Sequence, residues 1–179
     1  MPKPKVATDW LGDCAGCHMS LLDMDERILA VLSKVQLTSS PITDLKHPPP
    51  DGVEVGVLSG SINNTSNLAV ARMMRKRCKC LVAMGDCAVM GGILSLRNAF
   101  DMKEALQRAY VDTPSTVDGF IPESDELAKP LRNRPVDQVV DVDVYLPGCP
   151  PSADAIFHAL CELAEGRTPI LEGETLKYD

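Results

Sequence analysis

Cysteines are the residues in this sequence whose spacing indicates chemistry. The chain of 179 residues contains seven of them, and the first two form the motif Cys14-Ala15-Gly16-Cys17, which is followed by His18. Cys-x-x-Cys-His is the signature for covalent attachment of a c-type haem. Cys-x-x-Cys alone is also half of a zinc site, half of an iron–sulfur site, or a thioredoxin-like redox pair. Other residues along the chain must therefore distinguish these alternatives.

The elements that would position these cysteines alternate between strands and helices. Short apolar runs predict strands at residues 6–11, 53–58, 80–84 and 139–146. Apolar spacing and capping residues predict helices at 19–35, from Thr65 or Ser66 to Arg77, at 101–109, and from the Ser152 cap through Ala164. Residues 45–52 form a Pro-rich loop, and residues 111–138 show little periodicity, so we expect an irregular excursion before the last strand.

Alternating strands and helices predict an α/β fold built from right-handed βαβ units. We expect a flavodoxin-like, doubly wound parallel sheet of about four strands. The length suits a single domain, which we expect to span residues 1–179.

Three of the predicted strands end in a glycine that is closely followed by a cysteine. The segments are Gly12-Asp13-Cys14, Gly85-Asp86-Cys87 and Gly148-Cys149. Because the carboxyl ends of parallel strands lie at one edge of a sheet, Cys14, Cys17, Cys87 and Cys149 can converge there. Glycines permit unusual φ values and let backbone N–H groups approach thiolates or sulfides.

Four converging thiolates could bind either of two kinds of metal centre. Structural zinc usually takes two compact Cys-x-x-Cys pairs, whereas this chain has one such pair. Single ligands dispersed over strand-end loops favour a [4Fe–4S] cluster, with zinc and unliganded buried thiols as the alternatives.

The remaining cysteines and histidines have no comparable pattern. A c-type haem would leave Cys87 and Cys149 unexplained, so His18 is interpreted as a polar residue that opens the helix. Cys78, Cys80 and Cys161 are interpreted as core thiols, and His47 and His158 have no evident partner in the sequence.

Composition excludes several classes of partner. The net charge of −7 and the 4% aromatic content argue against a nucleic-acid or anionic-membrane surface, which would require a basic face. No window of ~18 consecutive apolar residues predicts a membrane span. The first residues include no apolar signal region and no twin arginine, so we expect a cytoplasmic protein without a disulfide framework.

Three motifs together carry a resemblance to a known family. Cys14-x-x-Cys17, Gly85-Asp86-Cys87-Ala88 and Pro147-Gly148-Cys149-Pro150-Pro151 resemble the small subunits of [NiFe] hydrogenases and the related cluster-bearing subunit of NADH:quinone oxidoreductase. The resemblance extends from Trp10 to about Leu163. It implies that Cys14, Cys17, Cys87 and Cys149 ligate one proximal [4Fe–4S] cluster beside a nickel–iron site on a separate large subunit.

Departures from the family pattern indicate which of these related subunits the chain resembles more. The quinone-oxidoreductase subunit typically has adjacent cysteines in the first motif, whereas two residues separate Cys14 from Cys17 here. We expect no export signal, and no cysteine follows Cys161 in the sequence, so the chain resembles the small subunit of soluble NAD-reducing hydrogenases. That resemblance implies diaphorase partners that carry FMN, further Fe–S clusters and the NAD site. Ser59 and Asp13 stand where relatives often have Glu, so the family's proton routes are not transferred.

The implied function is electron relay within an H2:NAD+ oxidoreductase complex, with no catalytic residue for H2 cleavage in this chain. One alternative is a quinone-oxidoreductase-like or other electron-transfer subunit without hydrogenase activity. Another is a zinc-stabilised interaction module. An FMN site in this chain is conceivable for the expected fold, but fold alone does not establish function.

Overall fold

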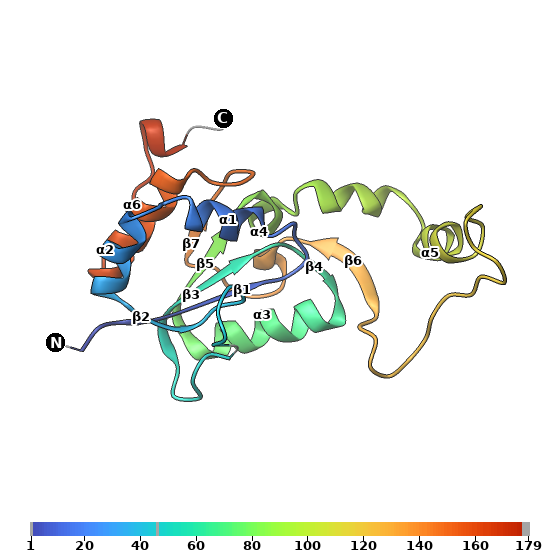
Figure 1. The fold of residues 1–179 in the computed structure, drawn as a ribbon, viewed down its shortest axis with the longest axis horizontal. Helices are drawn as coiled ribbons and strands as arrows, with labels where there is room; N and C mark the ends of the chain where they lie inside the picture. The colour runs from blue at the N-terminus through green and yellow to red at the C-terminus, as the bar shows by residue number, and fades with distance from the viewer. Residues whose placement is uncertain (1, 46, 177–179) are drawn as a thin grey trace.

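The computed structural model describes residues 2–45 and 47–176, in which strands and helices alternate (Figure 1). The strands are β1 (Lys5–Trp10), β2 (Gln36–Ser39), β3 (Val53–Ser59), β4 (Ile62–Asn64), β5 (Cys78–Met84), β6 (Pro130–Arg134) and β7 (Val144–Leu146). The α-helices are α1 (Gly16–Leu22), α2 (Arg27–Lys34), α3 (Thr65–Arg77), α4 (Asp86–Met90), α5 (Met102–Tyr110) and α6 (Ala153–Ala164). Three 3₁₀ helices accompany them in the described ranges: η1 (Ile93–Ala99), η2 (Val136–Gln138) and η3 (Gly173–Leu176).

The central sheet is parallel and has the strand order β2-β1-β3-β5-β7. Counted along the chain without the small strands β4 and β6, this is the order 2-1-3-4-5 of flavodoxin-like folds. The predicted fold class is therefore confirmed. The strand order reverses between β1 and β3, and in such sheets ligands bind outside the carboxyl ends of the strands.

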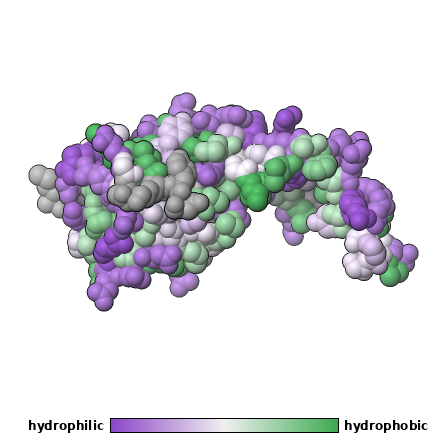
Figure 2. All heavy atoms as spheres, turned by 90° about the horizontal axis from the view of Figure 1, so that it is seen from above, coloured by the Kyte–Doolittle hydropathy of each residue, from purple (hydrophilic) through white to green (hydrophobic). Residues whose placement is uncertain are grey.

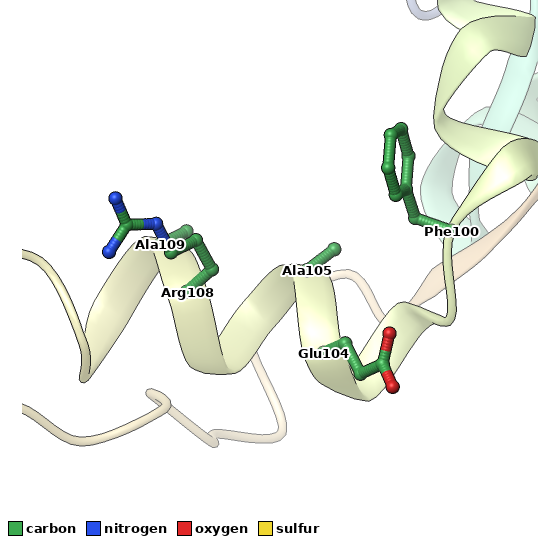
Figure 3. Close-up of a pocket in the computed structure, with 5 residues that line it drawn as sticks. All are labelled: Phe100, Glu104, Ala105, Arg108 and Ala109. Atoms are coloured by element: carbon green, nitrogen blue, oxygen red, sulfur yellow. The ribbon is translucent and has the colours of Figure 1, made fainter.

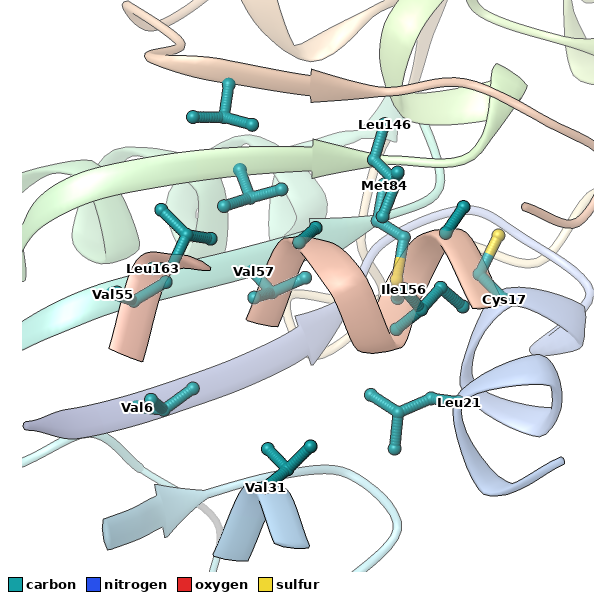
Figure 4. Close-up of a cluster of buried hydrophobic side chains, with 14 of the residues drawn as sticks. Val6, Cys17, Leu21, Val31, Val55, Val57, Met84, Leu146, Ile156 and Leu163 are labelled. Carbon is teal, nitrogen blue, oxygen red and sulfur yellow. The ribbon is translucent and has the colours of Figure 1, made fainter. Parts of the chain in front are cut away.

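Helices cover both faces of this sheet, as a doubly wound fold requires. On one face, α1, α2 and α6 pack over a core that includes Val57, Met84 and Ile156 (Figure 4). On the other face, α3 packs against β3 and β5 over a core that includes Met74 and Leu81. The central strands are thus buried on both sides, which explains why their sequences are continuous apolar runs. Within the described ranges, no helix combines the length and apolar character needed to cross a bilayer.

Two features of the N-terminal half differ from the sequence prediction. The sheet has five strands rather than about four, because β2 adds an edge strand in which Leu37 is the one strongly apolar residue. The single helix predicted at 19–35 is two helices, α1 and α2. Asp25 adopts a left-handed backbone conformation with φ of 51° between them, a conformation that Asp tolerates better than most residues.

The last strand is shorter than the predicted run of residues 139–146. The N–H groups of Val139 and Val140 donate to the carbonyl of Val136, which forms a turn instead of a strand ladder. The strand itself begins at Val144, and the preceding Asp143 is fixed by Leu81, whose N–H donates to its carboxylate (2.7 Å). The predicted excursion is partly ordered, because β6 pairs with β4 in an antiparallel two-stranded sheet.

An extended arm, defined here as residues 93–129, projects from the body of the molecule (Figure 1). It contains η1 and α5, and none of the residues of α5 is buried. Apolar side chains nevertheless lie on the arm with large exposed fractions, including Ile93 (72%), Phe100 (69%) and Phe120 (74%). Figure 2 shows hydrophobic atoms where the arm leaves the body. Figure 3 shows Phe100 and the α5 side chains that form a groove, namely Glu104, Ala105, Arg108 and Ala109.

Shortening Leu81 is expected to destabilise the fold strongly. The side chain is fully buried in the central strand β5, so Leu81→Ala removes apolar contacts and leaves a cavity. Such changes lower the free energy of unfolding by about 2–5 kcal/mol, which equilibrium urea unfolding would measure. The control Leu29→Ala, at a side chain that is 68% exposed on α2, should change it by less than about 0.5 kcal/mol. Equal effects of the two substitutions would contradict the described core.

Candidate metal centre

The carboxyl edge of the sheet carries the cysteines that the sequence singled out. Cys14 lies in the loop after β1, and Cys17 lies in the first turn of α1. Cys87 lies in α4 directly after β5, and Cys149 follows β7. The parallel sheet thus places residues that are far apart in the sequence on three neighbouring loops.

The four thiols lie close enough to influence one another electrostatically. Burial, followed in order by the charges of Asp13, Cys87, Cys14 and Cys149, raises the pKa of the Cys17 thiol to about 12. Burial also raises the pKa of Cys87, with Cys149 and Cys14 as the next contributions. A bound metal would supply positive charge at this position. That charge would lower the pKa values of these thiols and favour the thiolates.

The thiols differ in burial and do not enclose a single-ion site. Cys17 is buried and Cys87 is half-buried, whereas Cys14 and Cys149 are exposed. In the described part of the chain, no three His, Cys, Asp or Glu side chains are placed to hold one metal ion.

Asp13 organises the first cysteine loop. One of its carboxylate oxygens accepts a hydrogen bond from the backbone N–H of Ala15 (2.9 Å), and the other accepts one from the Ser59 hydroxyl (2.5 Å). Ala15 has a left-handed backbone conformation with φ of 65° and precedes the first residue of α1. The carboxylate therefore holds the segment between Cys14 and Cys17 against the end of β3.

Asp86 has a similar role in the second loop. Its carboxylate accepts a hydrogen bond from the N–H of Gly148 (2.7 Å), while its own N–H donates to the Gly148 carbonyl (2.9 Å). These two bonds connect the loop of Cys87 to the loop of Cys149. A third connection joins α1 to the same region, because the Ser20 hydroxyl donates to the carbonyl of Pro151 (2.6 Å).

Two glycines leave space for the cysteine sulfurs. A Cβ atom on Gly85 would lie 2.3 Å from Sγ of Cys17, and a Cβ atom on Gly92 would lie 2.6 Å from Sγ of Cys87. Both glycines have positive φ, 86° and 52° respectively. The backbone thus approaches the sulfurs more closely than any other residue type would allow.

His18 has buried polar contacts that its sequence interpretation did not include. It lies in the first turn of α1, as expected, but its side chain is fully buried. Its ring nitrogens contact the hydroxyls of Thr8 and Ser59, each at 3.1 Å, and its ring packs edge-to-face against Trp10. Sequence reasoning missed these polar contacts because Thr8 and Ser59 come from two different strands.

The other cysteines and histidines have different surroundings from the four edge cysteines. Cys78 is buried, and burial raises its pKa to about 11; Cys80 and Cys161 are half-buried against the core. His158 contacts the carbonyl of Ile170 (3.1 Å). Burial raises the pKa of the Asp9 carboxyl, and the nearby charge of His47 partly offsets this effect, so His47 does have a carboxylate neighbour.

Comparison with known proteins places this site in a family. Residues 14–163 match the family described as NADH ubiquinone oxidoreductase, 20 Kd subunit, and this range includes all four of the edge cysteines. The chain belongs to this family.

Proteins and solved structures similar to this chain include hydrogenase subunits. The delta subunit of the NAD-reducing hydrogenase HoxS from Cupriavidus necator is 38% identical, over 99% of this chain and 86% of that protein. A subunit of the F420-non-reducing hydrogenase from Methanothermobacter thermautotrophicus is 36% identical over 92% of this chain. This chain spans about half of that relative, 54% of its length. A chain in the crystal structure of an NAD+-reducing [NiFe]-hydrogenase in the H2-reduced state superposes with a TM-score of 0.94, at 36% identity and 99% coverage of both chains.

Proposed function

We propose that this chain is the electron-transfer small subunit of a cytoplasmic NAD-reducing [NiFe] hydrogenase, acting as one cluster-binding domain. The observation that carries the proposal is the likeness to the chain of the NAD+-reducing [NiFe]-hydrogenase structure, which has a TM-score of 0.94 and covers 99% of both chains. Because the likeness covers the whole length at 36% identity, it supports a common role as well as a common fold.

The proposed ligands of one [4Fe–4S] cluster are Cys14, Cys17, Cys87 and Cys149. Their donor chemistry fits the group, since Fe–S clusters are held by cysteine thiolates, and the charges of Cys87, Cys14 and Cys149 all act on the Cys17 thiol. Gly85 has no side chain, so its backbone approaches Cys17 Sγ closely. The space between them accommodates sulfur but not a Cβ atom. When bound, the cluster would supply one-electron transfer. The residues of this chain hold it, with Cys17 on the core side and Cys14 and Cys149 toward the surface.

The proposed partners are a large subunit with the nickel–iron site and diaphorase subunits with Fe–S clusters, FMN and NAD. The exposed position of Cys14 and Cys149 supports electron exchange across a subunit interface at this edge. The exposed apolar side chains of the arm, such as Ile93 and Phe100, support a large contact with another protein, since such patches mark interaction sites. In this proposal H2 is cleaved on the partner, and this chain relays electrons.

Anaerobic co-purification of the complex tests this proposal. We expect about four irons and four sulfides per chain and an EPR signal on reduction, together with a nickel-containing subunit and H2-dependent reduction of NAD+. One zinc and no iron would instead support a zinc-stabilised module. A cluster without nickel or H2 oxidation would support an electron-transfer subunit of another oxidoreductase.

A further inference from the structure

A buried chain of hydrogen bonds runs from the sheet to the first cysteine loop. The Thr8 hydroxyl donates to the Ser40 hydroxyl (2.8 Å), and Thr8 Oγ1 lies 3.1 Å from Nε2 of His18. Nδ1 of His18 lies 3.1 Å from the Ser59 hydroxyl, which contacts the carboxylate of Asp13. Four members, Ser40, Thr8, His18 and Ser59, are buried, with at most 5% of their surface exposed.

The carboxylate at one end determines the direction of these bonds. An ionised carboxylate can only accept, and a hydroxyl has one proton to donate, so the Ser59 proton points to Asp13. The Ser59 oxygen is then free to accept, and Nδ1 of His18 must carry the proton that it receives.

We infer that His18 is a positioning residue for the cluster loop, acting through a protonated Nδ1 that donates to Ser59. Its Nδ1–H fixes the Ser59 hydroxyl toward Asp13, and the other carboxylate oxygen of Asp13 holds the N–H of Ala15 between the two cysteines. His18 thereby sets the position and the hydrogen bonding of a carboxylate whose charge acts on the Cys17 thiol. This inference rests on the proposed function, because it concerns the loop that would hold the cluster.

Two substitutions of His18 with side chains of similar size distinguish hydrogen bonding through Nδ1 from a role in packing alone. The side-chain amide of Asn can place an N–H near the position of Nδ1, whereas the longer Gln places its amide near Nε2. We expect His18→Asn to keep the reduction potential of the cluster unchanged. We expect His18→Gln to lower it, because the Asp13 carboxylate loses its fixed donor and its charge then disfavours the added electron. A tenfold lower ratio of reduced to oxidised cluster corresponds to about 59 mV for one electron.

An EPR-monitored redox titration of the purified complex measures this difference. The control Trp10→Phe keeps an aromatic ring beside His18 and should leave the potential unchanged. Equal potentials of His18→Gln and the wild type, with the cluster retained, would overturn the inference while leaving the proposed function intact. A wild-type protein that binds no iron would instead refute the proposed function.

The protonation of Nδ1 can be measured even if the substituted chains do not fold. Nitrogen NMR of the full chain with labelled histidine distinguishes a protonated from an unprotonated ring nitrogen. We expect His18 Nδ1 to be protonated, with its resonance assigned by its loss in His18→Asn or, where that chain does not fold, by its coupling to neighbouring side-chain protons. An unprotonated Nδ1 would overturn the inference without reference to the cluster.

Discussion

Replacing Cys87 with serine is expected to abolish cluster binding and with it H2-dependent NAD+ reduction. Cys87 is half-buried at the end of β5, and its thiol lies in the electrostatic environment of Cys14 and Cys149. Serine offers a hydroxyl, which is a poor substitute for the thiolate that iron–sulfur clusters use. Loss of groups that merely support a metal ligand typically costs 10–100-fold in affinity or activity, so loss of a ligand should reduce the activity by more than about 100-fold.

Iron and sulfide analysis of the anaerobically purified complex measures this effect, with EPR of the reduced protein as a second measurement. Cys161→Ser is the matched control, because Cys161 is also half-buried but lies in α6, where it packs against the core. We expect this control to retain its iron and its activity. Unchanged iron content in Cys87→Ser, or equal losses in both variants, would refute the proposed ligand set.

The strands that are covered on both faces of the sheet were predictable from the sequence. The runs at residues 53–58 and 80–84 are apolar throughout because β3 and β5 are covered by helices on both faces, and this pattern is typical of parallel sheets. The edge strand β2 was missed because it has one neighbouring strand in the sheet, β1, and one strongly apolar residue, Leu37. The run at 139–146 has the alternation of a strand, but the hydrogen bonds from Val139 and Val140 to Val136 form a turn.

The convergence of the cysteines was predictable, whereas the groups that support them were not. Glycine followed by cysteine at the end of a predicted parallel strand is a local signal, and topology brings these ends together. The repeated Gly-Asp-Cys segments could also have indicated a common role for Asp13 and Asp86, which each fix a loop through their carboxylates. Ser20 and His18 gave no such signal. Their partners lie up to 131 positions away in the sequence, and local patterns contain no information on contacts of this kind.

Gly85→Ala is expected to remove the cluster although it changes no proposed ligand. Gly85 has φ of 86°, so any other residue is strained there by about 1–3 kcal/mol. The added Cβ would also lie 2.3 Å from Sγ of Cys17, so the thiol has to move. The backbone is poorly able to yield, because Gly85 N–H donates to the Leu146 carbonyl (2.7 Å) and the next residue is bonded to Gly148.

Gly166→Ala is the control that separates the backbone strain of Gly85→Ala from its displacement of the Cys17 sulfur. Gly166 also has positive φ, 73°, but a Cβ atom there would meet nothing within 4 Å. The control therefore carries a similar backbone penalty without displacing a sulfur, and we expect it to lower stability while retaining about four irons per chain. Iron analysis and thermal unfolding of both variants make the comparison. If Gly85→Ala kept its iron at the level of Gly166→Ala, Cys17 could not be a ligand held in place by this contact, and the proposed cluster geometry would have to be abandoned.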